Sequence, residues 1–476
     1  MIADLKPYAE YKESGLQWLG PVPGHWEVQR LKNWVTINRH TLGEGTPADL
    51  EFDYLEIGSV TTGRLAKRPV RLRFADAPSR ARRVLQSGDT IVSTVRTYLK
   101  AVLTVNECSQ PIVASTGFAV LSPRADTTPR CLGYVAQSEA FTNQVTAESV
   151  GIAYPAISET RLGNIAVTLP PPDEQAAIVR FLDWANGRLE RAIRAKRKVI
   201  ALLNEQKQAI IHRAVTRGLD PSVPLKPSGI PWLGDIPQHW DVMPLRRLVS
   251  AGRRITYGIV QPGDPHDGGI PMVRGKDYST GWVTQDSIFR VSSQIERAYV
   301  RSRLMPADIV MTIVGAGVGN VALVPDWLDG ANITQTTARI SINANASVPS
   351  FVLRVLEGPI GRRNLERYVY GAAQPRLNLP HVGAFDIPVP PQTEQLKIAA
   401  FLDKELRDFA KTSARLEREI ELLREYRTRL VADVVTGKLD VREAAAGLPD
   451  GAPSDTAEDD ADLKTDSDAS DEDALV

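Results

Sequence analysis

The sequence has few of the features that would point to a membrane protein, a secreted protein or a metalloprotein. Only two cysteines occur among its 476 residues, Cys108 and Cys131, and their spacing matches no zinc or redox motif. No stretch approaches about 18 uninterrupted apolar residues, and the start of the sequence has no signal-peptide core. We therefore expect a protein of the reducing cytoplasm that has no membrane association and no cysteine-rich zinc site.

Motifs for catalysis and nucleotide binding are also missing. The sequence has no GxxxxGK[ST] phosphate-binding loop and no NPP[YF] tetrapeptide of the kind that amino-methyltransferases carry. The segment Gly315–Gly319 follows an apolar run but lacks the third spaced glycine of a dinucleotide loop, and a strand-like segment follows it. We predict a glycine-rich hairpin there, and we expect no catalytic residue, metal or cofactor in this chain.

The net charge of zero hides two regions of opposite charge. Residues 450–476 carry eleven acidic residues and one basic residue, so the remaining body has 56 basic and 46 acidic residues. The acidic segment has no aromatic residue, and we expect residues 441–476 to form a disordered tail. The basic body is compatible with a polyanionic partner.

One stretch of about 50 residues occurs twice, with an offset of 220 positions. The first copy begins LPPPDEQAAIVRFLD and ends TRGLD, and the second begins VPPQTEQLKIAAFLD and ends TGKLD. Prolines precede each copy and acidic or capping residues follow in the first turn, so each copy predicts one long helix. Such a long repeat distance indicates a duplicated half-protein rather than a solenoid.

Apolar residues recur every seven positions in both copies. The second copy has Leu402, Phe409, Leu416, Leu423 and Leu430 in one column, and the first has Leu182, Leu189, Leu203 and Ile210, interrupted by Lys196. A long helix with a narrow apolar stripe needs a partner helix. The sequence supplies its own twin, so we predict an intramolecular coiled coil.

A second repeat opens each half of the chain. Residues 14–34 match residues 228–248 at 10 of 21 positions, including His25/His239 and Trp26/Trp240. We interpret these segments as packing elements in which both histidines form structural hydrogen bonds. Between the repeats, short strands separated by turns predict two diverged domains of the α+β class, with matching strands at 89–95 and 308–314.

This order of duplicated motifs resembles the specificity subunit of type I restriction–modification systems. The residues that carry the resemblance are the paired SGxxWLGxxPxHW segments, the PPxxEQ starts of the helices, the FLD that follows, and the LD at each end. The resemblance implies two target recognition domains, each reading one half of a bipartite site in double-stranded DNA. It also implies that the two long helices form an antiparallel spacer with pseudo-two-fold symmetry.

The resemblance further implies the partners. The helices would dock two methyltransferase subunits, and restriction or translocase subunits would join through that complex. S-adenosylmethionine, ATP and magnesium would then belong to the partner subunits. Two alternatives stay open: a coiled-coil scaffold that reads no sequence, and a specificity subunit of a system that only methylates DNA.

The predicted domains follow from the repeats. They are a first recognition domain at 1–170, a first helix at 171–220, a linker with the second recognition domain at 221–390, a second helix at 391–440, and the tail at 441–476.

Candidate DNA contacts lie in both recognition domains. Residues 64–100 hold ten basic residues and only two acids, a density that favours phosphate neutralisation. Arginine, glutamine and aromatic side chains near shared turns are the better candidates for reading bases. The candidates are Arg64, Lys67, Arg68, Arg71, Arg73, Arg96, Tyr98 and Lys100 in the first domain, and Arg274, Lys276, Tyr278, Gln374 and Arg376 in the second.

A rigid helical spacer would fix the distance between the two half-sites. Inserting one heptad into residues 173–215 is therefore expected to change the spacing of the recognised sequence. Methylome sequencing of a host that carries the variant measures this spacing, and an unchanged recognition sequence would contradict the spacer model.

Overall fold

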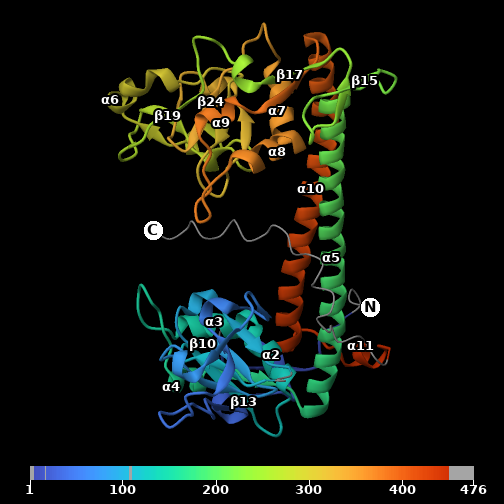
Figure 1. Cartoon of the computed structure of the whole chain (residues 1–476). Helices are drawn as coiled ribbons and strands as arrows, with labels where there is room; N and C mark the ends of the chain where they lie inside the picture. The colour runs from blue at the N-terminus through green and yellow to red at the C-terminus, as the bar shows by residue number, and fades with distance from the viewer. Residues whose placement is uncertain (1–4, 17, 107–109, 450–476) are drawn as a thin grey trace. The chain divides into compact units, whose positions relative to one another are not determined.

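Two long helices, one from each copy of the repeat, are the main elements of the computed structural model (Figure 1). Helix α5 spans Pro172–Arg217 and α10 spans Gln392–Val435. Both have glutamate in the first turn, where a negative charge interacts favourably with the helix dipole. Glycines with positive φ follow closely, Gly218 at 73° and Gly437 at 76°, a conformation that ends helices. The prediction of one long helix per repeat is confirmed.

The structure describes residues 5–16, 18–106 and 110–449, and these form two compact units. Unit 1 contains the described residues up to 196 together with 418–449, and unit 2 contains residues 197–417. Each unit thus holds one sheet-containing domain, the beginning of the long helix that follows it, and the end of the other long helix. Cys108 and the acidic segment 450–476 lie outside the described residues.

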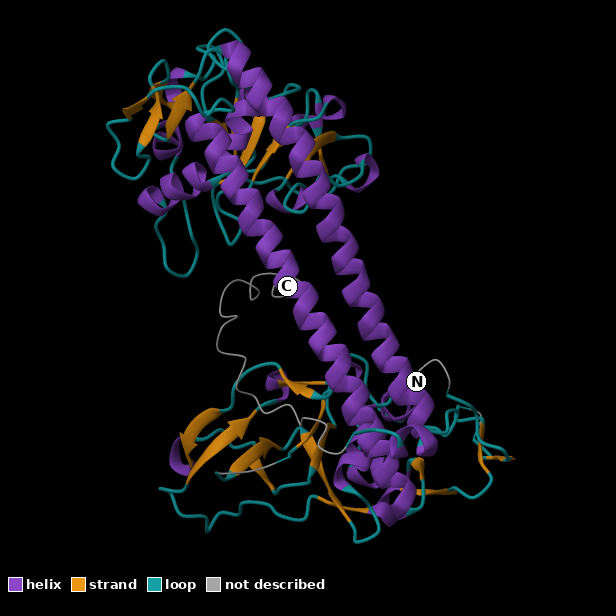
Figure 2. Cartoon of the chain, turned by 90° about the vertical axis from the view of Figure 1, so that its right-hand side faces the viewer, coloured by secondary structure: helices purple, strands orange, loops and turns teal. Residues whose placement is uncertain are grey.

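Within each unit the two helices run side by side (Figures 1 and 2), and apolar side chains pack between them. In unit 1 the early part of α5 shares a core with the last turns of α10, and in unit 2 the roles are exchanged. The shared residues are Leu182 and Ala185 with Leu430, Val431, Val434 and Val435 in unit 1, and Ile211, Ala214 and Val215 with Ile398, Ala399, Leu402 and Leu406 in unit 2. The pairing is therefore antiparallel, and the predicted coiled coil is confirmed.

Lys196, which interrupts the heptad column of the first repeat, is paired across the two helices. Its Nζ lies 2.5 Å from Oε2 of Glu419 on α10. Both side chains are about one third exposed, at 28% and 32%. A charged pair thus fills the position where the apolar column is broken.

Unit 1 contains two four-stranded sheets and a small helical layer. The first sheet has the order β11-β10-β13-β4 and is antiparallel, and the second has the order β8-β5-β12-β9 with β5 and β12 parallel. Their strands are β4 (Val35–Ile37), β5 (Glu51–Leu55), β8 (Val70–Arg73), β9 (Ala81–Leu85), β10 (Thr90–Ser93), β11 (Val102–Thr104), β12 (Ile112–Ser115) and β13 (Phe118–Pro123). The helices are α1 (Leu31–Trp34), α2 (Pro129–Gln137), α3 (Glu139–Ala147) and α4 (Glu159–Asn164). Three two-stranded pairs complete the unit: β1 (Tyr11–Glu13) with β2 (Pro21–Pro23), β3 (Glu27–Arg30) with β14 (Ala166–Leu169), and β6 (Val60–Thr61) with β7 (Arg64–Leu65).

Unit 2 repeats this arrangement with shorter strands. One sheet has the order β18-β24-β21-β22, and another has the order β20-β19-β23 with β19 and β23 parallel. The strands are β18 (Thr256–Tyr257), β19 (Ile270–Val273), β20 (Arg290–Val291), β21 (Ile309–Thr312), β22 (Val321–Leu323), β23 (Asn332–Ile333) and β24 (Thr337–Ile340). The helices are α6 (Ser293–Glu296), α7 (Pro349–Glu357), α8 (Pro359–Tyr368) and α9 (Leu379–Gly383), and short pairs join β15 (Leu225–Pro227) to β16 (Asp235–Pro237) and β17 (Asp241–Pro244) to β25 (Asp386–Val389).

The strands predicted from matching sequence in the two halves are central in both units. β10 lies between β11 and β13, and β21 lies between β22 and β24. An aspartate before each strand accepts a backbone N–H at 2.8 Å, from Gln86 to Asp89 and from Met305 to Asp308. The turn between β21 and β22 contains Gly315–Gly319, so the predicted glycine-rich hairpin is confirmed.

The HW segment and the EQ motif meet in the same way in both units. In unit 1, Glu174 Oε2 accepts hydrogen bonds from His25 Nε2 at 2.8 Å and from Trp26 Nε1 at 3.2 Å. In unit 2, Glu394 Oε2 accepts from His239 and Trp240 at the same two distances. Both histidines are therefore structural hydrogen-bond donors, as the sequence predicted.

The glutamine of the EQ motif joins each long helix to the segment before it. Gln175 donates to the Pro170 carbonyl at 2.9 Å and accepts the Thr128 N–H at 2.7 Å. Gln395 donates to Pro390 and accepts the Val348 N–H, both at 2.8 Å. Thr128 and Val348 are the N-cap residues of α2 and α7, so one amide connects two helix starts.

The two units differ in how the end of a long helix continues. In unit 2 the chain runs from Asp220 directly into β15. In unit 1 the equivalent Asp440 forms a β-bridge with Lys6, and its N–H donates to the Lys6 carbonyl at 2.8 Å. The repeat that opens each half has an offset of 214, which aligns Lys6 with Asp220. The helix repeat has an offset of 220, which aligns Asp440 with Asp220 as well. The Lys6–Asp440 bridge in unit 1 thus stands where the chain of unit 2 is continuous through Asp220.

The predicted boundary of the tail at residue 441 is wrong. Residues 441–449 are packed against unit 1, with α11 at Arg442–Ala446 and with Val441, Ala445 and Leu448 buried. Ala445 lies on the helix, and Val441 and Leu448 flank it on either side. The acidic composition that predicted disorder belongs only to residues 450–476.

Replacing the glutamate at the start of α5 is expected to destabilise the protein more than replacing its equivalent on α10. Glu174 is 3% exposed and Glu394 is 26% exposed, and Tyr8 also donates to Glu174. Glu174→Ala leaves buried donors unpaired, at a cost of about 2–4 kcal/mol. Thermal unfolding of the full chain, followed by tryptophan fluorescence, is expected to show the larger decrease in Tm for Glu174→Ala. Equal decreases for Glu174→Ala and Glu394→Ala would contradict the role of burial.

Candidate nucleic-acid interface

Two β-hairpins occupy equivalent positions in the two units. Hairpin A, residues 150–156, closes with paired backbone hydrogen bonds of 2.8 and 3.0 Å between Val150 and Ala156. Hairpin B, residues 370–376, closes with the same pair of distances between Tyr370 and Arg376. A second bridge joins each hairpin to the residue two positions after a central strand. Val95, after β10, pairs with Ala156, and Val314, after β21, pairs with Arg376. The backbone frame is therefore shared, and the side chains at the tips differ.

Hairpin A presents apolar and aromatic side chains to solvent. Ile152 is fully exposed at 104%, Tyr154 is 67% exposed and Val150 is 62% exposed. The guanidinium of Arg96 lies 5.0 Å from the centre of the Tyr154 ring. The N–H of Arg96 donates to the Pro155 carbonyl at 2.8 Å, so the predicted contact Arg96 is held against this hairpin.

Three predicted contacts, Arg96, Tyr98 and Lys100, share the turn between β10 and β11. Tyr98 is 52% exposed, and Lys100 Nζ donates to the side chain of Asn143 at 2.9 Å. The Thr62 hydroxyl donates to the Lys100 carbonyl at 2.7 Å, which brings the β6–β7 hairpin beside this turn. Arg64 lies on β7, and Lys67 and Arg68 follow it, all three exposed.

Hairpin B presents polar side chains. Gln374 and Arg376 are exposed, and Arg376 Nη2 donates to Gln374 Oε1 at 3.0 Å. Figure 1 draws this part of the chain as an orange loop that projects from the unit near α8 and α9. Guanidinium and amide groups match the hydrogen-bonding pattern of base edges. The predicted pair is therefore brought together at an exposed tip.

An open cavity of about 630 Å³ adjoins hairpin B. Tyr257, Tyr370 and Arg376 line it together with the amide residues Gln335 and Asn378. The Tyr370 hydroxyl donates to Asn378 Oδ1 at 2.9 Å. Aromatic faces and amide groups around one opening are suited to planar ligands with hydrogen-bonding edges.

The predicted arginines of β8 lie on one face of the strand, but acidic residues of β5 neutralise them. Arg71 contacts Glu51 at 3.3 Å and Asp53 at 3.4 Å, and Arg73 lies 3.6 Å from Glu51. Glu51 and Asp53 stand opposite Arg73 and Arg71 in the antiparallel register. The net positive charge here is smaller than the sequence run suggested.

Tyr278 does not fit its predicted role as a DNA contact. It is 4% exposed in the core of unit 2, and its hydroxyl lies 2.8 Å from Thr312 Oγ1. Burial raises its pKa to about 12. A contact with DNA would require this side chain to leave the core. The error arose because a tyrosine next to basic residues has the same sequence pattern whether it points outward or inward.

Arg274 has a structural partner, whereas Lys276 is exposed. The Arg274 guanidinium donates to both carboxylate oxygens of Asp277, at 3.0 and 3.1 Å, and lies 5.2 Å from the Phe289 ring. Asp277 is buried at 2%, so removing Arg274 would leave a buried charge without its partner. Lys276, on the turn between them, is the more accessible cation.

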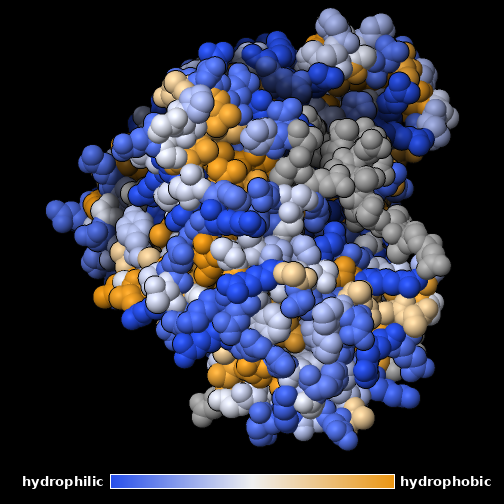
Figure 3. All heavy atoms as spheres, turned by 90° about the horizontal axis from the view of Figure 1, so that it is seen from below, coloured by the Kyte–Doolittle hydropathy of each residue, from blue (hydrophilic) through white to orange (hydrophobic). Residues whose placement is uncertain are grey.

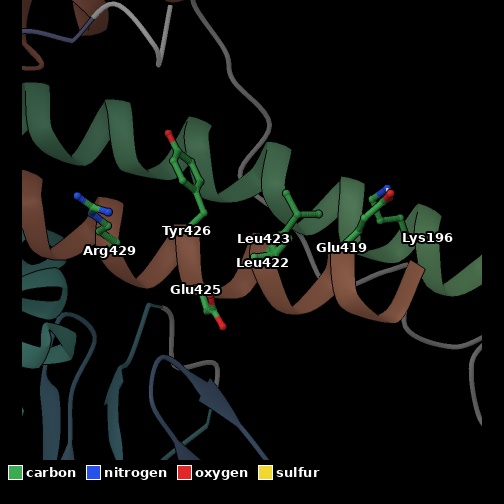
Figure 4. Close-up of a pocket in the computed structure, with 7 residues that line it drawn as sticks. All are labelled: Lys196, Glu419, Leu422, Leu423, Glu425, Tyr426 and Arg429. Carbon is green, nitrogen blue, oxygen red and sulfur yellow. The ribbon is translucent and has the colours of Figure 1, made fainter. Parts of the chain in front are cut away.

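A groove of about 610 Å³ lies along the coiled coil within unit 1. Its lining combines α10 side chains with Lys196 of α5, and Leu422 and Tyr426 are 47% and 41% exposed. Figure 4 shows Tyr426 directed toward α5 and Glu425 on the opposite side of α10. Elsewhere the surface is mixed, as in Figure 3, where small hydrophobic groups alternate with hydrophilic ones. An exposed tyrosine and leucine in a groove are typical of protein-docking surfaces.

Sequence reasoning missed Ile152, Tyr154 and Tyr370. The signal was available, because GIAYP and GAAQP occupy the same place in the two repeats and differ at two positions. Identical neighbours with different tip residues indicate a shared loop with a different contact surface.

Within the residues that the structure describes, no group of histidine, cysteine or acidic side chains could hold a metal ion. Over that same part of the chain, no helix has the length and apolar content needed to cross a membrane.

Comparison with known proteins identifies relatives that match more than half of this chain. The specificity subunit of the type I restriction enzyme EcoBI from Escherichia coli is 28% identical over 270 residues, which cover 56% of this chain and 55% of that protein. The MjaVIII specificity subunit from Methanocaldococcus jannaschii is 21% identical over 301 residues, covering 62% of this chain and 67% of that protein. The matched regions thus span about half to two thirds of these relatives.

A solved structure supports the fold. A chain from a study of assembly and conformational transition in a type I restriction–modification system matches with a TM-score of 0.65 at 21% identity, covering 88% of this chain and 99% of that chain. The family model of the type I restriction modification DNA specificity domain matches residues 80–197 and 240–422, more than half of the sequence. Its two matched regions each contain one recognition domain's central strands and the start of the long helix that follows. The chain therefore belongs to the type I restriction modification DNA specificity family.

Proposed function

We propose that this chain gives a type I restriction–modification complex its DNA sequence specificity, with each unit reading one half of a bipartite site in double-stranded DNA. The observation that carries the proposal is the pair of hairpins on one shared frame. Val95 and Val314 hold hairpins A and B in the same way, while the tips offer different chemistry. A constant frame with variable tips is what reading two different half-sites requires.

The distribution of charge supports DNA as the ligand. Outside residues 450–476 the chain has ten more basic than acidic residues, and exposed cations such as Arg64, Lys67 and Lys276 lie in the recognition domains. These would neutralise phosphates, which positions a protein on DNA without reading its sequence. Gln374 and Arg376 would read base edges.

The chain itself would be non-catalytic, and its partners would carry the chemistry. Two methyltransferase subunits would dock on the α5–α10 helices, with the groove at Leu422 and Tyr426 contributing to one contact. Restriction or translocase subunits would join through that complex. S-adenosylmethionine, ATP and magnesium would be held by these partners, and the complex would act in the cytoplasm, away from membranes.

Two alternative functions make different predictions. A specificity subunit of a methylation-only system would bind methyltransferase subunits but would confer no cleavage of unmodified DNA. A coiled-coil scaffold would bind proteins and show no sequence preference on DNA. The diverged tips of hairpins A and B favour a reader of sequence over a scaffold.

Replacing Arg376 with alanine is expected to weaken recognition of one half-site. Loss of an arginine that reads a base edge costs about 1–3 kcal/mol, or roughly 5- to 150-fold in affinity, and relaxes the preference at that base pair. Binding of the assembled methyltransferase complex to duplexes varied at each position measures both effects.

Tyr278→Phe is the matched control for Arg376→Ala. It removes a buried hydroxyl bonded to Thr312 and is expected to lower stability by about 1 kcal/mol without changing the sequence preference. Unchanged binding of Arg376→Ala to every duplex would remove Arg376 from the set of readers.

Introducing charge into the groove on the coiled coil is expected to weaken methyltransferase docking. Tyr426→Asp places a carboxylate on an apolar contact surface, and we expect at least a roughly tenfold loss of affinity for the methyltransferase subunit. Leu225→Asp, at an equally exposed leucine on β15 (43%), is the control and is expected to bind normally. Calorimetry with the purified subunits measures both, and full affinity of Tyr426→Asp would exclude the groove.

A further inference from the structure

The tip of hairpin A carries a large aliphatic side chain that contacts nothing around it. Ile152 is 104% exposed, more than the other large hydrophobic side chains among the described residues. At the equivalent place in hairpin B, 220 positions later, stands Ala372. An isoleucine in water on a closed hairpin gives the fold no packing energy, so its side chain is available for contact with something outside the chain.

The other side chains at this tip are held by contacts of their own. Tyr154, on the same tip, lies under the Arg96 guanidinium at 5.0 Å. Arg96 adopts a left-handed conformation with φ of 50°, a strained geometry for a residue with a side chain. The bond from its N–H to the Pro155 carbonyl fixes that conformation against the hairpin. The aromatic ring and the cation are therefore held in place before any ligand binds.

Three cations lie on the segments beside hairpin A. Besides Arg96, Lys100 lies on the same turn, and Arg161 donates to the Glu148 carbonyl at the base of the hairpin at 3.1 Å. The nearby acids are the exposed Glu148 and Glu159, and Glu159 accepts from Asn38. Cations around an exposed aliphatic and aromatic tip match the requirements of a DNA duplex, with phosphates outside and stacked bases inside.

We propose that hairpin A acts as a wedge: Ile152 enters a base-pair step of the first half-site, and Tyr154, supported by Arg96, stacks on the opened step. Proteins that insert aliphatic side chains between bases pay an unstacking cost and gain contact with the deformed duplex. Hairpin B reads its half-site through hydrogen bonds from Gln374 and Arg376. The two halves of the site are thus recognised by different physical means, deformability in one and base edges in the other.

This inference rests on the proposed DNA-reading function, and the test separates the two. The assembled complex of the full chain with methyltransferase subunits is bound to a duplex that carries its methylated site, with 2-aminopurine placed at successive steps of the first half-site. Wild type and Ile152→Leu are expected to increase the fluorescence at one step. Ile152→Ala is expected to lose this increase and to bind roughly tenfold more weakly.

A mismatch at the responding step provides the decisive control. It opens the step in advance and is expected to restore most of the affinity of Ile152→Ala, a rescue that general destabilisation of the protein would not produce. Wild-type affinity and fluorescence in Ile152→Ala would overturn the wedge and leave the DNA-reading function intact. Loss of methyltransferase assembly in Ile152→Ala, with normal DNA binding by the complexes that do form, would make hairpin A a protein contact and also overturn the wedge. Absence of any sequence preference in the wild-type complex would overturn the wedge and the proposed function together.

Discussion

The carboxylate at the beginning of each long helix is the contact on which the rest of the architecture depends. Glu174 and Glu394 each accept hydrogen bonds from a histidine and a tryptophan of the segment that opens the same half of the chain. Each tryptophan also packs against the end of the other long helix. A Cβ on Gly218 would lie 3.3 Å from Trp240, and one on Gly437 would lie 3.2 Å from Trp26. One buried indole therefore fixes the start of one helix and the end of the other, which keeps the helices antiparallel.

This frame explains why the domains between the repeats are free to diverge. Bridges from Val95 and Val314, which follow strands β10 and β21, position hairpins A and B from outside the hairpins. Gly151 and Gly371, with φ of 115° and 92°, supply the turn that both tips need, because this conformation is unfavourable for other residues. The tip residues make no contact that the fold requires. Their side chains can therefore change with little effect on the packing energy of the fold.

The charges show how strongly tertiary contacts alter the meaning of a basic run. Ten basic residues within 64–100 suggested a continuous phosphate-binding surface. Arg71 and Arg73 instead pair with Glu51 and Asp53 of the neighbouring strand. In an antiparallel pair the partner residue comes from elsewhere in the chain, so the local sequence cannot reveal that it is acidic. The cations with exposed heads, such as Arg64 on β7 and Lys67 just after it, are fewer.

The sequence by itself determined the duplication, the two helices, their apolar seam and the structural role of the histidines. These features repeat at fixed offsets, and periodic patterns report local geometry directly. The pairing of Lys196 with Glu419, the burial of Tyr278 and the packing of residues 441–449 were decided only by the tertiary structure. In each case the deciding neighbour is far away in the sequence. The same holds for the hairpin tips. The sequence shows that GIAYP and GAAQP differ, but only the fold places Ile152 fully in solvent and brings Arg96 against Tyr154.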